Sequence, residues 1–397
     1  MKYETTGLVP IKMWFDDVDE KTLDQAKNLS NLPFAHKWIA LMPDAHCGYG
    51  MPIGGVLAAK GVIIPNAVGV DIGCGMSALQ IPLQDIGSGL LKDILGKIRQ
   101  RVPVGFKHHD KPQNALLMPG ANLQTLEGWY EVVLSEYDSA LHQIGTLGGG
   151  NHFIEIQRGS DDYIWIMVHS GSRNLGYKVA KHYNILAREL NEKWYTQVPL
   201  SHQLAFLPVD SEEGLHYRGE MNYCVEFAYC NRKLMMERII ECFKEVILEK
   251  DIGGPYPTTD RMINIAHNYA ALENHYGKNV MVHRKGATLA REGTIGIIPG
   301  SQGTKSYIVE GKGNPESFHS CSHGAGRKMS RTKAREELSL EAEQKKLDDK
   351  GILHSVRGKS SLDEAPGAYK DIAKVMVNQR DLVGIVVGLE PLAVIKG

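Results

Sequence analysis

The sequence predicts an α+β fold in which one large mixed α/β domain covers residues 1–397. Strand-like runs separated by glycine-rich turns occupy the first third of the chain, and longer stretches with helical periodicity follow them. No Pro/Ser-rich linker divides the chain, and the residues suited to chemistry are spread from 71 to 396. Although this length would suffice for two or three domains of average size, the spread favours a single one.

The first expected elements are turns, a strand and a helix. Glycine-rich turns at 44–50 and 69–75 allow the backbone to fold sharply, and a short strand at Gly61–Pro65 lies between them. Apolar residues recur at helical spacing over residues 86–101, which predicts the first long helix.

The later elements are mostly helical. Helices are expected over residues 174–195 and, as the longest, over Glu220–Lys250, where apolar residues recur every three or four positions. A charged, solvent-facing helix is expected over residues 330–350, and a final strand over Leu382–Ile395. Three cysteines within the longest helix are expected to fill core space rather than to bind a ligand: Cys224, Cys230 and Cys242.

The composition excludes several classes of protein. No run approaches the roughly 18 apolar residues of a membrane span, and no signal segment is recognised. Lys and Arg number 45 against 46 Asp and Glu, so any attraction to nucleic acid must be local. The six cysteines include no CxxC pair, which favours a reducing cytoplasm. The 42 glycines and 16 histidines suggest tight loops that present metal or phosphate ligands.

Two histidines are predicted to face each other across a β-hairpin. Its strands are expected over Phe153–Ile156 and Tyr163–Val168. If the turn is centred at residues 160 and 161, His152 pairs with His169, with Cβ atoms about 5 Å apart. Imidazoles so placed suit a shared metal such as zinc, iron, copper or nickel. The alternative is that each is an ordinary hydrogen-bonded histidine beside a strand.

Further metal ligands are expected near these histidines. Asp71 and Cys74 place a carboxylate and a thiol three residues apart in a glycine turn, and a thiolate is a strong metal ligand. Alternatively, Cys74 is a small buried residue in that turn. His267 follows an apolar pair and is a weaker candidate. With three imidazoles, the set would bind two divalent ions if one ligand bridges them.

The segment Ser320–Lys328 has a different character. Small residues surround His323, and a basic helix is expected directly afterwards, so backbone N–H groups and Arg327 could bind phosphate. A histidine held there can act as a nucleophile on phosphorus, or it can merely hydrogen-bond an anion. Pro299–Ser306 is a second candidate cradle, although it lacks the order of a Walker A loop. Basic residues near these loops could follow a nucleic-acid backbone: Arg173, Arg284, Lys285, Arg327 and Arg331.

Taken together, these segments resemble the RtcB RNA ligases. The resemblance extends in order over nearly the whole chain. The matching stretches are Asp44–Gly50, Gly69–Met76, Gly149–Glu155, His169–Arg173, His267–Tyr269, Arg284–Ala287, Pro299–Ser301, Ser320–Arg327 and Lys396–Gly397. The segment 102–113, with His108-His109-Asp110, does not match, and Gln302 stands where a methionine is common.

The resemblance implies a GTP-dependent ligase that joins RNA ends bearing a 2′,3′-cyclic phosphate or 3′-phosphate to 5′-hydroxyl ends, in tRNA splicing or RNA repair. It implies a fold with β-sheets surrounded by helices around a central metal and nucleotide cleft. His323 would be guanylylated. Two Mn²⁺ ions would be held by Asp71, Cys74, His152, His169 and His267, with Cys74 contacting both.

The GTP pocket that the resemblance implies contains more residues than the metal site. It comprises Asn151, His152, Phe153, Ile154, Glu155, His267, Asn268, Pro299, Gly300, Ser301, Gln302, Ser306, His323, Gly324, Ala325, Gly326 and Lys396. Arg173 and Arg327 are weaker candidates for RNA contacts, and an activating protein partner is a further expectation.

Two other functions compete with ligation. A two-metal phosphohydrolase would use the same five metal ligands but would have no need of His323 or Lys396. A non-catalytic RNA-binding subunit would bind RNA equally well without metal.

Overall fold

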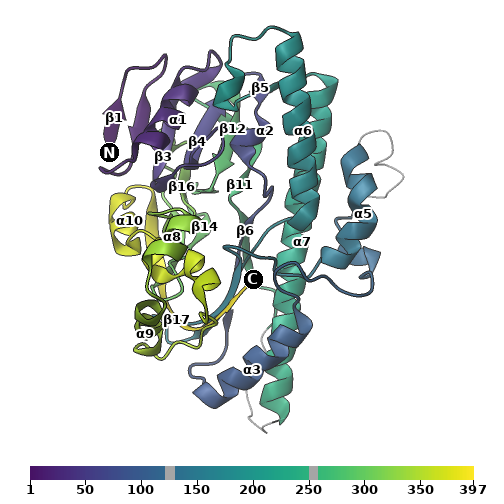
Figure 1. Ribbon diagram of the computed structural model, residues 1–397, viewed down its shortest axis with the longest axis vertical. Coiled ribbons are helices and arrows are strands. Elements are labelled where there is room, and N and C mark those ends of the chain that lie inside the picture. Colours follow the sequence, from purple (N-terminus) through teal and green to yellow (C-terminus); the bar gives the residue numbers. More distant parts are fainter. Residues whose placement is uncertain (121–129, 250–257) are drawn as a thin grey trace.

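The computed structural model describes residues 1–120, 130–249 and 258–397, and it has the mixed α/β architecture that the sequence predicts (Figure 1). Two sheets form its centre. The six-stranded sheet contains, in spatial order, β1 (Lys2–Glu4), β2 (Ile11–Met13), β3 (Ala35–His46), β4 (Ile53–Ala59), β12 (Lys278–Lys285) and β11 (Asn268–His275). The seven-stranded sheet contains β10 (Ile263–Ala266), β6 (Gly75–Ile81), β8 (Ile164–Ser170), β7 (Phe153–Gly159), β17 (Val383–Lys396), β15 (Ser306–Gly311) and β14 (Ile295–Ile298).

Shorter strands and the helices complete the fold. Two small antiparallel pairs are β5 (Val62–Ile63) with β9 (Leu207–Pro208), and β13 (Ala287–Leu289) with β16 (Ser320–Ser322). The α-helices are α1 (Glu20–Ser30), α2 (Pro65–Val68), α3 (Ser88–Arg101), α5 (Glu131–Gln143), α6 (Arg173–Lys193), α7 (Glu212–Glu249), α8 (Arg331–Glu337), α9 (Leu340–Asp348) and α10 (Ile372–Asn378). Short 3₁₀ turns include η4 (Lys359–Glu364).

The long helix α7 organises one side of the molecule. Its apolar face packs with α3 on the seven-stranded sheet, where Ile98, Ile166 and Phe243 are fully buried in one cluster. The same helix packs against α6, and the two run side by side (Figure 1). Burial of this apolar surface fixes α7 directly behind the strand ends that carry the candidate site. Within the described ranges, no helix is both long and apolar enough to cross a bilayer.

Several predicted elements agree with the structure. The helices expected over 86–101 and 174–195 correspond to α3 and α6, and the final strand corresponds to β17. The longest helix is α7, although it begins earlier than expected, at Glu212. Its cysteines pack in the core as predicted, Cys224 and Cys242 fully buried and Cys230 partly so.

Two predicted elements were wrong in extent. The single helix expected over 330–350 is divided into α8 and α9, because Leu338 is extended and the side chain of Ser339 accepts a hydrogen bond from the Ala342 N–H to begin a new helix. This segment was also expected to face solvent throughout, but Glu343 and Leu347 are buried. The strand expected over Gly61–Pro65 shortens to β5, because Pro65 begins α2.

Candidate active site

The candidate site lies where the two sheets meet. His267 is the single residue between β10, in the seven-stranded sheet, and β11, in the six-stranded sheet. Its backbone N–H donates to the carbonyl oxygen of Cys74 (2.8 Å), just before β6. The chain therefore carries His267 directly onto the glycine turn that precedes β6.

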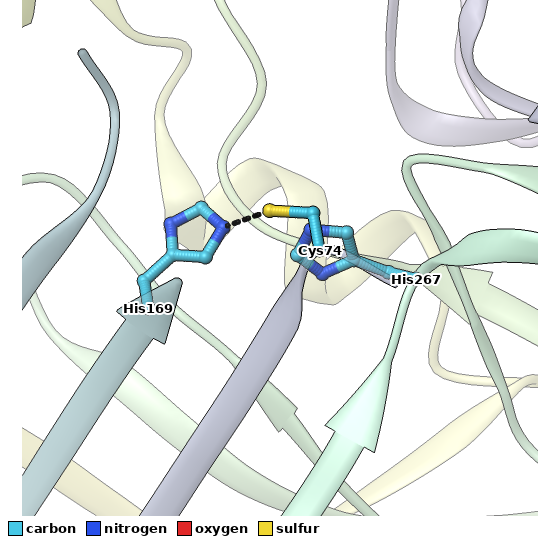
Figure 2. A group of neighbouring side chains, drawn as sticks. All are labelled: Cys74, His169 and His267. Atoms are coloured by element: carbon cyan, nitrogen blue, oxygen red, sulfur yellow. Dashed lines mark hydrogen bonds between the residues drawn. The ribbon is translucent and has the colours of Figure 1, made fainter. Parts of the chain in front are cut away.

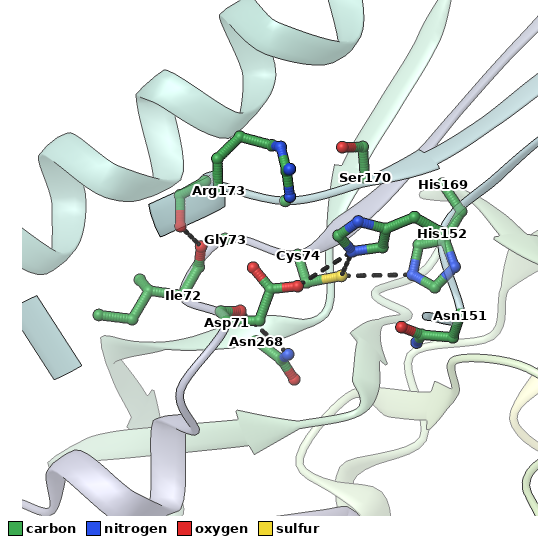
Figure 3. Close-up of polar contacts among 12 residues, drawn as sticks. Asp71, Ile72, Gly73, Cys74, Asn151, His152, His169, Ser170, Arg173 and Asn268 are labelled. Carbon is green, nitrogen blue, oxygen red and sulfur yellow. Dashed lines mark hydrogen bonds and ion pairs between the residues drawn. The ribbon is translucent and has the colours of Figure 1, made fainter. Parts of the chain in front are cut away.

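Cys74 lies at the centre of two groups of metal-ligating side chains. One group is Cys74, His169 and His267, all buried, and Figure 2 shows the two imidazoles on either side of the thiol. The other is Asp71, Cys74 and His152, drawn in Figure 3. In each group the ligand atoms lie within 4.8 Å of one another. Among the described residues, these five therefore converge as the sequence predicts, with Cys74 common to both groups.

The hydrogen bonds around the cluster orient its donors. His152 Nε2 lies 3.1 Å from Asp71 Oδ2 and 3.5 Å from Cys74 Sγ, and His169 Nε2 lies 3.3 Å from Cys74 Sγ. On the other side of its ring, His152 Nδ1 lies 2.9 Å from the Leu147 carbonyl oxygen, so Nδ1 donates there and Nε2 faces the cluster.

The hairpin register differs from the predicted one. Phe153, not His152, pairs with His169, and His152 lies just before β7 begins. The reason is the turn, which has three residues instead of two and places Asp162 in the left-handed region at φ 63°. The two imidazoles still converge, with ring centroids 5.3 Å apart.

The chemistry of these donors fits divalent metal ions. Burial lowers the pKa of His169 and of His267 far below the usual range, so both rings are neutral, the form that binds a metal. The Nδ1 atom of His267 is buried and has no hydrogen-bond partner among the described residues. Burial raises the pKa of the Cys74 thiol, and the nearby Asp71 raises it further. A bound cation would reverse this effect and favour the thiolate.

His323 lies next to this cluster, in the loop after β16. Its ring centroid is 4.8 Å from that of His267. On the other side, its Nδ1 lies 2.6 Å from Oδ2 of Asp44, a fully buried residue near the end of β3. The same carboxylate oxygen accepts the backbone N–H groups of His323 (3.1 Å) and Gly324 (3.3 Å). These contacts hold the loop and the ring together.

Glycine is required around this ring. Gly286 has φ 59°, and a Cβ there would lie 3.1 Å from the His323 ring and 2.4 Å from Ile53. Gly326 has φ 71°, and a Cβ there would lie 2.2 Å from the Asp44 carbonyl oxygen. A side chain at either position would displace the histidine loop.

The basic helix expected after Ser320–Lys328 is α8, which begins at Arg331. The Ser330 side chain accepts the N–H of Lys333 in its first turn, so that N–H group is not free to bind phosphate. The loop from His323 to Gly326 is held by Asp44, and it lies close to Pro299, whose carbonyl oxygen would be 3.3 Å from a Cβ on Gly324.

The residues expected to bind the nucleotide fall into three groups. In the first, Lys396 Nζ donates to the Asn151 carbonyl oxygen (3.3 Å) and lies 5.5 Å from the centre of the Phe153 ring. Burial raises the pKa of Glu155 to about 8, although Lys396 opposes this effect. Ile154 is fully buried in the core behind them.

The second group is the Pro299 segment. The Ser306 hydroxyl accepts the Gly300 N–H (3.1 Å) and a bond from the Gln157 side chain (3.2 Å). Ser301 bonds within the loop, to Thr304 (2.7 Å from its N–H to the hydroxyl oxygen). Gln302 donates from its buried amide to the Glu364 carbonyl oxygen (2.7 Å).

The third group contains Asn268 and the end of the histidine loop. The Asn268 amide donates to the Asp71 carbonyl oxygen (3.1 Å) and accepts the Gly286 N–H (2.7 Å), so it ties the metal-ligand turn to the histidine side of the site. Ala325 and Gly326 are buried where the loop leaves the site.

The predicted RNA-contacting arginines occupy different positions. Arg173 extends beside Asp71 (Figure 3) and donates to the Thr146 hydroxyl (3.1 Å) and the Gly105 carbonyl oxygen (3.3 Å). Arg327 donates to Glu364 Oε1 (3.2 Å) and the Asp363 carbonyl oxygen (2.6 Å). Arg284 is fully buried against Glu273, so it cannot follow an RNA backbone. Lys285 is likewise buried and donates to backbone carbonyl oxygens.

Two residues were missed by the sequence analysis. Asp44 is one of them, although a buried carboxylate near the end of an apolar strand is almost always paired, which would have marked it. Arg232 lies in α7, is fully buried, and donates through Nη1 to the carbonyl oxygens of Gly73 and Ser170 (2.9 Å each). Nothing in the helical pattern distinguished Arg232 from a solvent-facing charge.

Comparisons with known proteins show the family to which the chain belongs. The sequence model of the family described as "tRNA-splicing ligase RtcB" matches residues 25–397. The chain belongs to the RtcB family of RNA ligases. Its relatives include the RNA-splicing ligase RtcB of Escherichia coli K12, 39% identical with both chains covered completely. The tRNA-splicing ligase RtcB of Thermococcus kodakarensis is 32% identical, over all of this chain and 96% of its own length. The chain is therefore an RtcB-family enzyme, of the ligase class.

Proposed function

We propose that the protein is a GTP- and Mn²⁺-dependent ligase that joins RNA ends carrying a 2′,3′-cyclic phosphate or 3′-phosphate to RNA ends carrying a 5′-hydroxyl. The observation that carries this proposal is the position of His323, whose ring is 4.8 Å from that of His267 in the ligand cluster. A nucleophile so placed can react with a phosphate whose charge the cluster's metal ions neutralise.

The ligand set supports binding of two divalent ions. The groups Cys74, His169, His267 and Asp71, Cys74, His152 share the thiol, which would contact both ions. Bound there, the ions would neutralise phosphate charge and stabilise charge developing during in-line displacement. Thiolate and imidazole donors alone would suit zinc or iron equally well, so manganese is proposed from membership of the family.

His323 is proposed as the nucleophile because its two ring nitrogens have different surroundings. With Nδ1 directed to Asp44, Nε2 is the nitrogen left to form a bond with the α-phosphorus of GTP. The bond from that phosphorus to the oxygen bridging to the β-phosphorus breaks, and pyrophosphate leaves. His323 then carries GMP through a phosphorus–nitrogen bond, with the guanylate resting among the residues of the proposed pocket.

The RNA steps return His323 to its starting state. Hydrolysis first opens any cyclic phosphate to a 3′-phosphate. An oxygen of that phosphate displaces His323 from the GMP phosphorus, which gives RNA capped by GMP through a pyrophosphate linkage. The 5′-hydroxyl oxygen then attacks the RNA 3′-phosphorus, GMP leaves, and the hydroxyl proton is lost to solvent.

The proposed substrates are cleaved tRNA halves or other structured RNAs with these ends, acted on with or without an activating protein. We place the reaction in the cytoplasm, since all six cysteines are free thiols in the structure and none is paired.

A covalent adduct tests this proposal. Incubation with GTP and Mn²⁺ should increase the intact mass by one GMP, and His323→Ala should abolish both the adduct and RNA joining. His319→Ala is the matched control, since His319 lies in the same segment but packs against His275 instead of the cluster. RNA joining by His323→Ala would disprove the nucleophile, and release of a 3′-phosphate without GTP would indicate the phosphohydrolase.

A further inference from the structure

The segment 102–113, which departs from the family pattern, is anchored to the glycine loop that precedes His152. The Gly105 N–H donates to the Gly148 carbonyl oxygen (2.8 Å), and the Leu147 N–H donates to the Pro103 carbonyl oxygen (2.9 Å). Val104 and Gly148 also form a parallel bridge. Together with the bond from Arg173, these contacts fix Gly105 at the edge of the candidate site.

Phe106, the next residue, projects entirely into solvent. Its relative exposure is 101%, and the flanking Lys107 and His108 are exposed as well. Burying a phenylalanine side chain typically stabilises a fold by about 1.5–3 kcal/mol, so this ring contributes nothing comparable to the folded chain. A fixed backbone thus holds an aromatic ring outside the core.

The glycine loop Gly148–Gly150 lies between Phe106 and the metal ligands, with Gly148 buried and Gly149 and Gly150 half-buried. A Cβ on Gly148 would lie 2.7 Å from His152 Nδ1 and 2.1 Å from Arg173 Nη1. A Cβ on Gly149 would meet only the Gly105 Cα, at 3.6 Å, and one on Gly150 would lie 2.8 Å from Arg331 Nη2. Of the three glycines, only Gly149 has room beside it for a phosphate chain, with the Arg173 and Arg331 side chains packed against its two neighbours.

We propose that Phe106 is a stacking platform for an unpaired base at the RNA end whose terminal phosphate enters the metal cluster. This inference rests on the proposed function and names the recognition of its substrate. Proteins bind single-stranded RNA by combining exposed aromatic rings, on which bases stack, with cations along the backbone. The exposed Lys107 and the half-exposed Arg331, which also pairs with Glu364 (3.1 Å), supply that charge here, and Arg173 adds to it from behind Gly148.

An RNA-binding assay tests this platform. It measures, by fluorescence anisotropy with Mn²⁺ and without GTP, the affinity for a 3′-phosphorylated single-stranded oligoribonucleotide. Phe106→Ala should weaken affinity by between about fivefold and about 150-fold, the range for loss of one stacked base. Phe106→Trp should retain the affinity. Tyr195→Ala is the matched control, because Tyr195 is 92% exposed just beyond α6 and should leave binding unchanged.

A second RNA, identical but lacking its 3′-terminal base, isolates the contact. Wild type and Phe106→Ala should bind this RNA with equal affinity. If Phe106→Ala binds the complete RNA as tightly as wild type, the platform does not exist, and the ring contacts another partner, such as a protein. The GMP adduct on His323 forms without RNA, so its absence would refute the proposed ligase independently of these affinities.

Discussion

Asp44 illustrates how one buried carboxylate can orient a histidine ring. It contacts His323 through Nδ1 and also accepts two backbone N–H groups of the same loop, so the ring and its backbone share one anchor. Because Nδ1 faces Asp44, Nε2 is the ring nitrogen directed away from this carboxylate, and an unprotonated nitrogen is the form needed for attack on phosphorus.

We therefore expect Asp44→Asn to slow formation of the GMP adduct by roughly 100-fold, because the amide neither fixes the tautomer nor holds the ring as tightly. Rapid-quench measurement of the adduct would give this rate. Mn²⁺ affinity should be unchanged, since Asp44 belongs to neither ligand group. An Asp44→Asn protein that is guanylylated at the wild-type rate would show that His323 is oriented by other contacts.

At the scale of single residues, sequence patterns located the candidate metal ligands but not the residues that support them. Asp71, Cys74 and the three histidines were predicted from residue chemistry, whereas the hairpin register was one residue out because the turn length depends on the left-handed Asp162. The contact between Asp44 and His323 joins residues 279 positions apart. No local pattern encodes such a pair.

Among the elements, the helix α7 places a buried charged side chain, Arg232, on a largely apolar packing face. Arg232 donates to Gly73 and Ser170, which adjoin Cys74 and His169 in sequence, and through Nε to the Asn264 side chain (2.7 Å) near His267. One guanidinium thus connects the three strand ends that carry a ligand group. Sequence periodicity predicted the helix but not this contact, because a charge in an amphipathic pattern is normally solvent-facing.

Arg232→Met should lower the free energy of unfolding by roughly 2 to 6 kcal/mol, from about 1–3 kcal/mol for each carbonyl that loses its donor. Mn²⁺ affinity should fall by about 10- to 100-fold, as for other residues that support metal ligands. Denaturant unfolding and metal titration would measure the two effects. Arg238→Met is the matched control on the same helix, since Arg238 binds the Gly145 carbonyl oxygen and Gln113 instead. Equal metal affinities in the two variants would contradict the proposed support.

For the whole molecule, a buried histidine makes stability depend on pH. His283, in β12, accepts the Ile64 N–H at Nε2 (2.9 Å), and its Nδ1 lies 3.1 Å from the Met281 carbonyl oxygen. Burial lowers its pKa to about 4, against about 6.5 for an exposed histidine. Protonation would place a charge in the core and break the bond from Ile64.

Between pH 6.5 and 4 the unfolded chain binds a proton at His283 that the folded chain does not, so this residue makes the protein less stable as pH falls. Its contribution is about 1.4 kcal/mol per pH unit in this range. His283→Gln should remove that part of the slope in metal-free urea unfolding. Glu155, with a pKa of about 8, makes the protein more stable as pH falls from about 8 to 4.5. This contribution is the same in wild type and in His283→Gln, so it cancels in the comparison. Identical slopes for the two proteins would contradict the assignment.

The arrangement of the strands in the two sheets was the feature that local sequence patterns predicted least. Helix and strand periodicity indicated a mixed α/β fold, but the order of strands depends on pairings such as β12 with β4, which join residues more than 200 positions apart. The assignment of residues 1–397 to a single domain stays a prediction.

The passage of the chain through His267 from one sheet to the other has a mechanical consequence. Any sliding or tilting of the six-stranded sheet relative to its neighbour would pull that imidazole away from Cys74, because only one residue spans the junction. Gentle warming or dilute denaturant that lets the two sheets move relative to each other should therefore abolish turnover, while the circular dichroism signal of both sheets is unchanged.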